Sequence, residues 1–179
     1  MESKVSIYPY PTGGVPSPIQ VGDVTSTAKG SGARFNAGKP PMDLLPISIL
    51  AEYWRTAKDS PAARSLAHLG EWQKTGKRIN LMFALDALEG DIWQEAAGVF
   101  DYGRKKYAEW NWAKGMAWSV PTGCAVRHLL AIIEKDEDID PESGKSHRGH
   151  AACNIIMLLT YETTFPEGDD RTRYLVDAE

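Results

Sequence analysis

The sequence of 179 residues is poor in cysteine and has no long apolar run. Its two cysteines, Cys124 and Cys153, are too few for a disulfide framework, so we expect buried thiols in a reducing, cytoplasmic compartment. No uninterrupted apolar stretch approaches the roughly 20 residues of a membrane span, and the N-terminus lacks the apolar centre of a signal peptide. We therefore expect no membrane partner.

An excess of positive charge is also missing. The formal net charge is -4 and the sequence pI is about 5.6, whereas binding along a polynucleotide backbone needs a basic surface. This balance argues against polymeric nucleic acid as the partner, although local clusters of cations can still hold a small phosphate ligand. Apolar residues make up 42% and charged residues 25% of the chain, which is typical of a globular domain with a substantial core.

The first 33 residues differ from the rest in composition. They contain closely spaced prolines and glycines and little periodic hydrophobicity, so they bury too little surface to offset the entropy of ordering. We predict an extended or flexible N-terminal arm over residues 1–33 and a helical catalytic domain over residues 34–179. The arm is either a flexible tail or is anchored on a neighbouring subunit by Ile7, Tyr8 and Tyr10.

Helical periodicity dominates the remainder of the chain. Apolar residues recur every three to four positions, no proline lies between Pro61 and Pro121, and no segment alternates with a period of two. The pattern predicts helices over residues 47–58, 61–69, 91–107, 121–136 and 147–163. We therefore predict an all-α helical bundle.

A polar stripe interrupts the last of these apolar helices. His147, His150 and Asn154 follow one another at spacings of three and four residues, which places them on one helix face. A polar stripe on a largely buried helix is costly unless it meets partners or lines a wet cavity. We interpret the stripe as one side of a binding site; the alternative is that these residues cap the helix or face solvent.

Carboxylates end the preceding helix. Glu134 and Glu137 form an E-x-x-E pair, and Asp138 follows them. A short turn joins the two helices, so they must be antiparallel neighbours, and the carboxylates come close to His147 and His150. Carboxylates that converge from two helices of a bundle often hold a divalent metal; the alternative is a solvated acidic turn.

A cationic and aromatic segment follows the helix predicted over residues 91–107. Lys106, Tyr107, Asn111 and Trp112 offer a cation for phosphate, an amide for a base edge and aromatic faces for stacking. The alternative is helix capping together with core tryptophans. The segment 34–46 adds two cations, Arg34 and Lys39, and a further amide, Asn36.

The chain contains the segments RFNAGKPPMDLLP, VFDYGRKKYAEWNWAKG, RHLLAIIE and DEDIDPESGKSHRGHAACNIIMLL. Their order and spacing resemble the phage dATP/dGTP diphosphohydrolase family, which includes the MazZ enzymes and is related to MazG-like all-α nucleotide pyrophosphohydrolases. The resemblance covers residues 34–162. It implies hydrolysis of dGTP or dATP to the monophosphate and pyrophosphate in the infected host cell, with dGMP supplied for 2-aminoadenine DNA. It also implies a homodimer or homotetramer.

The resemblance implies a Mg²⁺ or Mn²⁺ cofactor as well. MazG-like proteins use E-x-x-E and E-x-x-D on successive helices, and Glu134 with Glu137 matches the first element. Asn154 stands where the aspartate is expected, and His150 lies near the position of the glutamate, which suits Mn²⁺ or a phosphate contact. The predicted metal ligands are Glu134, Glu137, Asp138 and His150.

Chemistry at the α-phosphorus needs an activated water and cations for the leaving pyrophosphate. We predict His128, which orients or deprotonates the water, and Glu134 as the catalytic residues. The predicted substrate-binding residues are Arg34, Asn36, Lys39, Lys106, Tyr107, Asn111, Trp112, Arg127 and Asn154. Two alternatives remain open: a nucleotide-binding or regulatory bundle without turnover, and a purely structural interaction protein.

Overall fold

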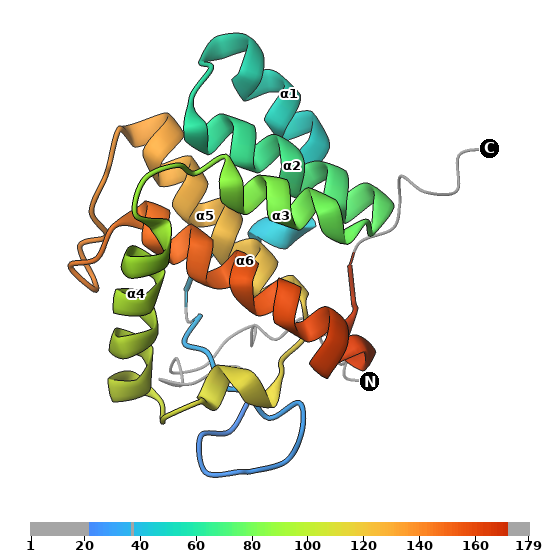
Figure 1. Cartoon of the computed structure of the whole chain (residues 1–179), viewed down its shortest axis with the longest axis vertical. Helices are drawn as coiled ribbons and strands as arrows, with labels where there is room; N and C mark the ends of the chain where they lie inside the picture. Colours follow the sequence, from blue (N-terminus) through green and yellow to red (C-terminus); the bar gives the residue numbers. More distant parts are fainter. Residues whose placement is uncertain (1–21, 37, 172–179) are drawn as a thin grey trace, which may run out of the picture.

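The computed structural model describes residues 22–36 and 38–171, and these residues form a helical bundle (Figure 1). Its elements are η1 (Met42–Leu44), α1 (Ile47–Ala57), α2 (Pro61–Thr75), α3 (Arg78–Asp86), α4 (Ile92–Lys106), η2 (Asn111–Lys114), α5 (Ser119–Lys135), α6 (His147–Thr164) and η3 (Pro166–Gly168). The described residues contain no strand, so the all-α prediction is confirmed. No helix among them combines the length and apolar character needed to cross a membrane.

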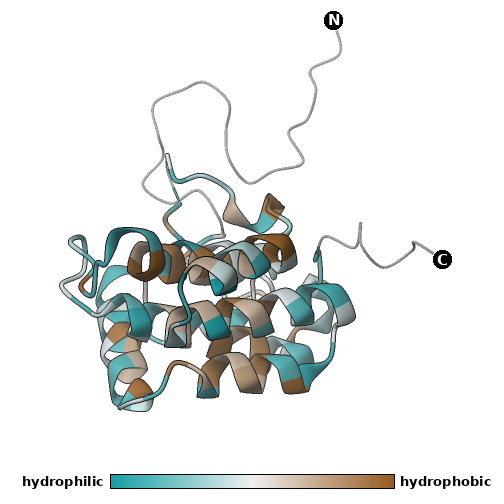
Figure 2. Cartoon of the chain, turned by 90° about the horizontal axis from the view of Figure 1, so that it is seen from above, coloured by the Kyte–Doolittle hydropathy of each residue, from teal (hydrophilic) through white to brown (hydrophobic). Residues whose placement is uncertain are grey.

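Helices α5 and α6 form the centre of the bundle. They pack against each other more extensively than any other pair of elements, and α4 covers one side of α6. The turn that joins them returns the chain directly: the backbone N–H of His147 donates to the carbonyl oxygen of Asp138 at 2.8 Å. This turn is largely hydrophilic and lies at the left edge of Figure 2. The predicted antiparallel pair is therefore present.

Local capping explains where α2 begins and ends. The Ser60 hydroxyl accepts a hydrogen bond from the Ala63 N–H, Pro61 occupies the first turn, and Gly76 ends the helix in a left-handed conformation. The predicted start is correct, but the helix continues six residues past Leu69, to Thr75. Gly70 lies inside it, where a side chain would press on α1: an added Cβ would lie 2.8 Å from the backbone nitrogen of Ser48.

We expect Gly70→Ala to lower the free energy of unfolding by about 1–2 kcal/mol. The added methyl group would force α1 and α2 apart, and the cost of this separation exceeds the gain in helix propensity. Gly98→Ala in α4 is the matched control, since its Cβ meets nothing closer than the Lys145 Nζ at 3.9 Å. It should gain up to about 1 kcal/mol. Denaturant titrations of both variants measure the difference, and equal stability would contradict the close contact of α1 with α2.

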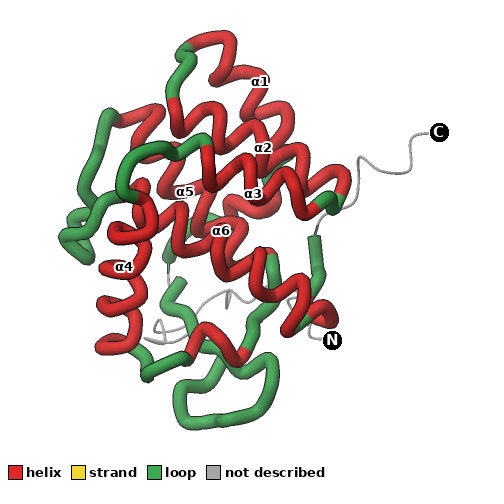
Figure 3. Tube along the Cα trace, in the orientation of Figure 1, coloured by secondary structure: helices red, strands yellow, loops and turns green. Residues whose placement is uncertain are grey.

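The periodicity analysis missed α3. Its apolar residues surround the helix: Leu81 and Leu85 are buried, whereas Ile79, Met82 and Phe83 are exposed. A helix that is apolar on every side has no stripe for a periodicity search to find. Figure 3 shows α3 between α2 and the later helices.

The described part of the predicted arm packs on the domain. The backbone N–H groups of Gly30 and Gly32 donate to the carbonyl oxygens of Lys114 and Gly115, at 2.6 and 2.8 Å. Residues 30–33 thus lie against η2 and Gly115, which follows it. The remainder of the arm, residues 1–21, lies outside the described residues, as do the proposed anchors Ile7, Tyr8 and Tyr10.

Candidate functional site

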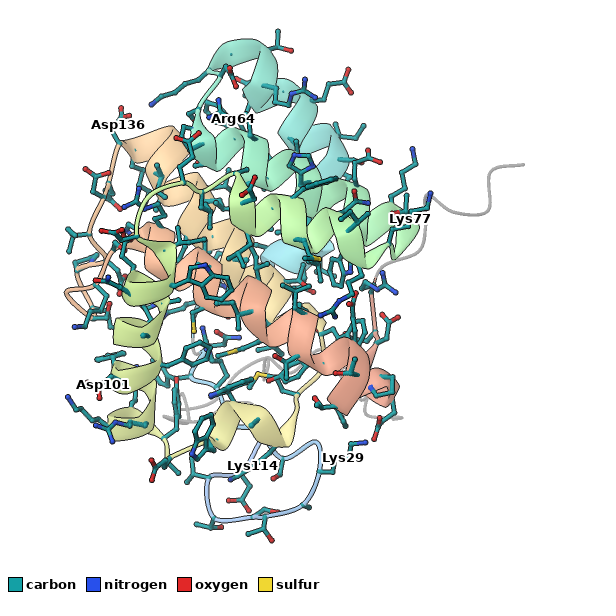
Figure 4. All side chains as sticks on the ribbon, viewed as in Figure 1. Lys29, Arg64, Lys77, Asp101, Lys114 and Asp136 are labelled. Atoms are coloured by element: carbon teal, nitrogen blue, oxygen red, sulfur yellow. The ribbon has the colours of Figure 1, made fainter. Side chains whose placement is uncertain are left out.

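A cavity of about 520 Å³ opens between α4, α5, α6, the segment 33–39 and the loop that contains η2. Its volume lies within the usual range of small-molecule sites. Asp101 on α4, which is labelled in Figure 4, is one of the residues that line this cavity. The predicted site residues that line it are Arg34, Asn36, Lys39, Lys106, Tyr107, Asn111, Trp112, Arg127, His128 and His150.

One wall of the cavity is aromatic. The rings of Phe100 and Trp112 lie 4.9 Å apart at a tilt of 40°. The Tyr107 hydroxyl accepts a hydrogen bond from the backbone N–H of Phe35 at 2.9 Å, and the Lys106 ammonium lies 5.0 Å from the centre of the Phe35 ring. This wall can stack a planar base, with a cation close by.

The two candidate base-reading amides differ in their partners. Asn111 holds the backbone of Ala33 through both amide atoms, accepting from its N–H at 3.1 Å and donating to its carbonyl oxygen at 2.8 Å. Asn36 is also buried, with 1% of its surface exposed, but its Nδ2 has no hydrogen-bond partner. A buried unpaired donor is costly, so Asn36 is the amide with a hydrogen bond to offer a ligand.

Two guanidinium groups enter the cavity without a carboxylate partner among the described residues. Arg34 Nη2 donates to the Asn154 Oδ1 at 3.1 Å, and the Asn154 Nδ2 donates to the His150 carbonyl oxygen. Arg127 Nη2 donates to the Pro40 carbonyl oxygen at 2.9 Å, and its buried Nε has no partner. Asn154 therefore positions Arg34 rather than lining the cavity itself, and both arginines can accept an anion.

Glu142 holds two further cations at the cavity. Its carboxylate accepts from Lys39 Nζ at 2.8 Å and from Lys106 Nζ. These hydrogen bonds, the stronger from Lys106, lower the pKa of Glu142 to about 2. The pair links the segment 33–39, the end of α4 and the α5–α6 turn.

The depressed pKa of Glu142 predicts the sign of a pH dependence. Its interaction with the lysines is fully present above the ordinary carboxyl value of 4.5 and is lost as the pH falls toward about 2. The difference in free energy of unfolding between the wild type and Glu142→Gln should therefore be constant above about pH 5.5 and shrink below about pH 4.5. Denaturant titrations across this range measure it. A difference that does not vary with pH would refute the contact.

Three histidines meet beside these cations. His128 Nδ1 lies 2.8 Å from His147 Nδ1, and the His128 and His150 rings stack with centres 4.3 Å apart. The His150 Nε2 contacts the Ser143 hydroxyl at 2.6 Å, and that hydroxyl donates to Asp140 Oδ2 at 2.7 Å. His147 and His150 are buried, with 4% and 7% of their surfaces exposed, so the polar stripe faces the protein interior and not solvent.

The three imidazole rings are neutral at pH 7. Burial, followed by the neighbouring rings of His150 and His147, lowers the pKa of His128 well below 6.5. Burial likewise lowers the pKa of His147, and it lowers the pKa of His150 to about 4. Neutral imidazoles keep the lone pairs that a metal ion or a proton needs.

His128, His147 and Asp140 fit a divalent cation. Each offers one ligand atom, and these atoms lie within 4.8 Å of one another. The His147 Nε2 is buried and has no hydrogen-bond partner, as expected where a ligand is to be bound. Two nitrogens and one carboxylate oxygen suit Mn²⁺ and similar ions better than Mg²⁺.

The structure places the predicted metal ligands in different environments. Glu137 Oε2 lies 3.7 Å from His147 Nε2, and His150 lines the cavity. Glu134 and Asp138 are exposed and lie outside the lining of the cavity. The carbonyl oxygen of Asp138 accepts from the His147 N–H at the start of α6. No contact among the described residues supports Glu134 as a ligand or a catalytic group, so both of these roles stay predictions.

Sequence reasoning did not select two residues of this candidate cation site, His147 and Asp140. His147 belongs to the same stripe as His150, so the spacing already placed it on the right face. Asp140 lies in the acidic turn, where alternation of aspartates gives no indication of which carboxylate points inward. The N–H of Asp140 donates to the Lys145 carbonyl oxygen at 2.8 Å, and this closed turn directs its side chain toward Ser143 and His150.

The fold and cavity define an all-α protein in which two guanidinium groups, without carboxylate partners in the described part of the chain, lie beside a histidine–carboxylate cluster. The family model described as dATP/dGTP diphosphohydrolase, N-terminal, matches residues 67–171. The chain therefore belongs to the dATP/dGTP diphosphohydrolase family, as the sequence segments predicted.

A dATP/dGTP diphosphohydrolase of Salmonella phage PMBT28 is 31% identical over 87 residues, which cover 49% of this chain and 29% of that protein. This chain therefore matches less than a third of its relative's length. No solved structure matches. The family match includes the histidines and Asp140, whereas Arg34 and Asn36 precede it.

Proposed function

We propose that the chain hydrolyses a purine deoxynucleoside triphosphate, dGTP or dATP, to the monophosphate and pyrophosphate. The observation that carries this proposal is the pair Arg34 and Arg127, which enter the cavity without carboxylate partners among the described residues. A triphosphate brings about four negative charges, and guanidinium groups are well suited to phosphate. The family match and the name of the phage relative support the same activity.

The base and the phosphates would occupy different parts of the cavity. The aromatic wall at Phe100 and Trp112 offers a stacking surface. The unpaired Asn36 Nδ2 offers a donor to an acceptor atom of the nucleotide. Arg34 and Arg127 then hold the phosphates and stabilise the charge that develops on the leaving pyrophosphate.

The histidine cluster would serve the attacking water. A divalent cation held by His128, His147 and Asp140, which we propose to be Mn²⁺ or Mg²⁺, would lower the pKa of a water molecule and neutralise phosphate charge. His128 Nδ1 and His147 Nδ1 lie 2.8 Å apart, so without a cation one ring donates to the other. A bound cation would replace this hydrogen bond, and each neutral ring would then offer it one lone pair.

The lowered pKa of His128 favours one of its two possible roles, orienting the water, over the other, taking up its proton. A neutral, weakly basic imidazole is better at orienting a water than at holding its proton.

In a phage-infected cell this reaction would supply dGMP for synthesis of 2-aminoadenine nucleotides.

We further propose a homodimer or homotetramer, which the exposed apolar side chains Met82, Phe83 and Trp93 support. Sedimentation equilibrium gives the mass directly; a monomer at every concentration would exclude this assembly.

The test of the proposed activity is a product analysis. Purified chain is incubated with each of the four deoxynucleoside triphosphates and Mn²⁺ or Mg²⁺, and the products are resolved by chromatography. We expect dGMP or dAMP with pyrophosphate, and slower turnover of dCTP and dTTP. Binding without turnover would replace this proposal by a regulatory nucleotide-binding bundle. If the chain neither binds nor turns over any of these nucleotides, the result would favour a structural interaction protein.

A further inference from the structure

The cavity contains two thiols that the proposed reaction does not use. Cys124 on α5 and Cys153 on α6 are free, buried and part of the cavity lining. Their surroundings differ. The Cys124 Sγ lies 3.6 Å from Arg127 Nη1 and 3.7 Å from Asn36 Oδ1, whereas no hydrogen bond from the described residues reaches Cys153.

The surroundings shift the pKa values of the two thiols in opposite directions. Burial by itself would raise the pKa of Cys124, but Arg34 and Arg127 outweigh it and hold this pKa below its ordinary value. Burial raises the pKa of Cys153 to about 12. The thiolate is the reactive form of cysteine, so these surroundings favour reaction at Cys124 over reaction at Cys153.

Asn36 provides a second, independent indication at this site. Its amide is 1% exposed, lines the cavity and has an unpartnered Nδ2. The protonated Cys124 thiol donates to Asn36 Oδ1. If the amide turns by half a revolution, its Nδ2 donates to an ionised sulfur instead, and the unpartnered donor is satisfied. Cys124 thus has hydrogen-bond partners in both of its forms.

We propose that Cys124 is a site of oxidation by hydrogen peroxide that opens into the substrate cavity. The Cys124 sulfur attacks one peroxide oxygen, an S–O bond forms, the O–O bond breaks and hydroxide leaves, so that the thiolate becomes a sulfenic acid. Sulfur loses two electrons and peroxide gains them. The added oxygen lies against Arg127 and Asn36, so oxidation blocks the anion site. This consequence rests on the proposed function, whereas the oxidation itself does not.

The experiment exposes the intact chain to hydrogen peroxide for increasing times and removes the peroxide with catalase. The chain is then unfolded in the presence of dimedone, which traps sulfenic acids independently of access, and the labelled peptides are identified by mass spectrometry. We expect Cys124 to be labelled at least about tenfold faster than Cys153. Equal rates, or faster labelling of Cys153, would overturn the proposal.

Two variants test why Cys124 should be labelled faster than Cys153. Arg127→Gln should slow labelling of Cys124 about tenfold, since it removes one of the two cations near the sulfur; an unchanged rate in a folded variant would contradict the role of the cation. Cys153→Ser should leave labelling of Cys124 unchanged.

Protection by dGTP separates this inference from the proposed function. Slower labelling of Cys124 in the presence of dGTP supports both. Labelling of Cys124 that dGTP does not slow supports the oxidation site and contradicts the position given to the nucleotide. Turnover of dGTP by a chain whose Cys124 does not react supports the activity and overturns only the oxidation site.

Discussion

Replacement of Arg34 by methionine should lower kcat/KM for dGTP at least about a hundredfold, which corresponds to roughly 2.7 kcal/mol. Arg34 contributes charge-assisted hydrogen bonds to the cavity and has no carboxylate partner among the described residues. Each such bond to a phosphate is worth about 1.5–3 kcal/mol. Methionine keeps an unbranched, flexible stem but offers neither charge nor donor.

The control for this variant is Arg55→Met, which removes an exposed guanidinium from α1. Its kinetic constants should stay within about twofold of the wild type, because screened surface charges contribute little. Thermal unfolding of both variants separates loss of binding from loss of structure, since Arg34 also contacts the buried Asn154. A folded Arg34→Met chain with wild-type kcat/KM would show that the phosphates bind elsewhere.

Asp140→Asn should reduce the affinity for Mn²⁺ about a hundredfold and reduce metal-dependent turnover with it. The substitution keeps the shape of the side chain and removes the negative charge of the one carboxylate in the histidine cluster. Loss of a ligand is expected to cost at least as much as loss of an outer-shell partner, for which 10–100-fold is typical. Calorimetric titration with Mn²⁺ measures the affinity directly.

Glu134→Gln is the matched control for Asp140→Asn. It makes the same chemical change on the exposed side of α5, and we expect Mn²⁺ affinity within about twofold of the wild type. This pair of variants distinguishes the ligand set that the structure gathers from the one predicted from the E-x-x-E motif. Loss of affinity in Glu134→Gln with retention in Asp140→Asn would establish the motif-based set instead.

The sequence predicts the helices of the central pair well because α5 carries apolar periodicity, α6 is a long and largely apolar segment, and a short turn joins them. The stripe of His147, His150 and Asn154 is also visible in the sequence, since helical spacing alone places these residues on one face. The same argument fails for α3, whose apolar residues surround the helix. It also ends α2 too early, because a glycine that permits close packing is indistinguishable from one that ends a helix.

Roles within the site are harder to predict because they depend on contacts between distant segments. Asn36 and Asn111 are equivalent as candidate base readers in the sequence. The structure separates them because both amide atoms of Asn111 hold the backbone of Ala33, 78 residues away, while the Asn36 Nδ2 has no partner. Spacing likewise cannot show that the α5–α6 turn directs Asp140 inward and leaves Glu134 exposed.

Hydrolysis of dGTP in water enriched in ¹⁸O tests the central claim most directly, because the label marks the phosphorus atom that is attacked. The account predicts that one ¹⁸O atom appears in dGMP and none in pyrophosphate, since Arg34 and Arg127 bind the departing phosphates and the water approaches the α-phosphorus. Label in the pyrophosphate, or release of tripolyphosphate, would contradict it.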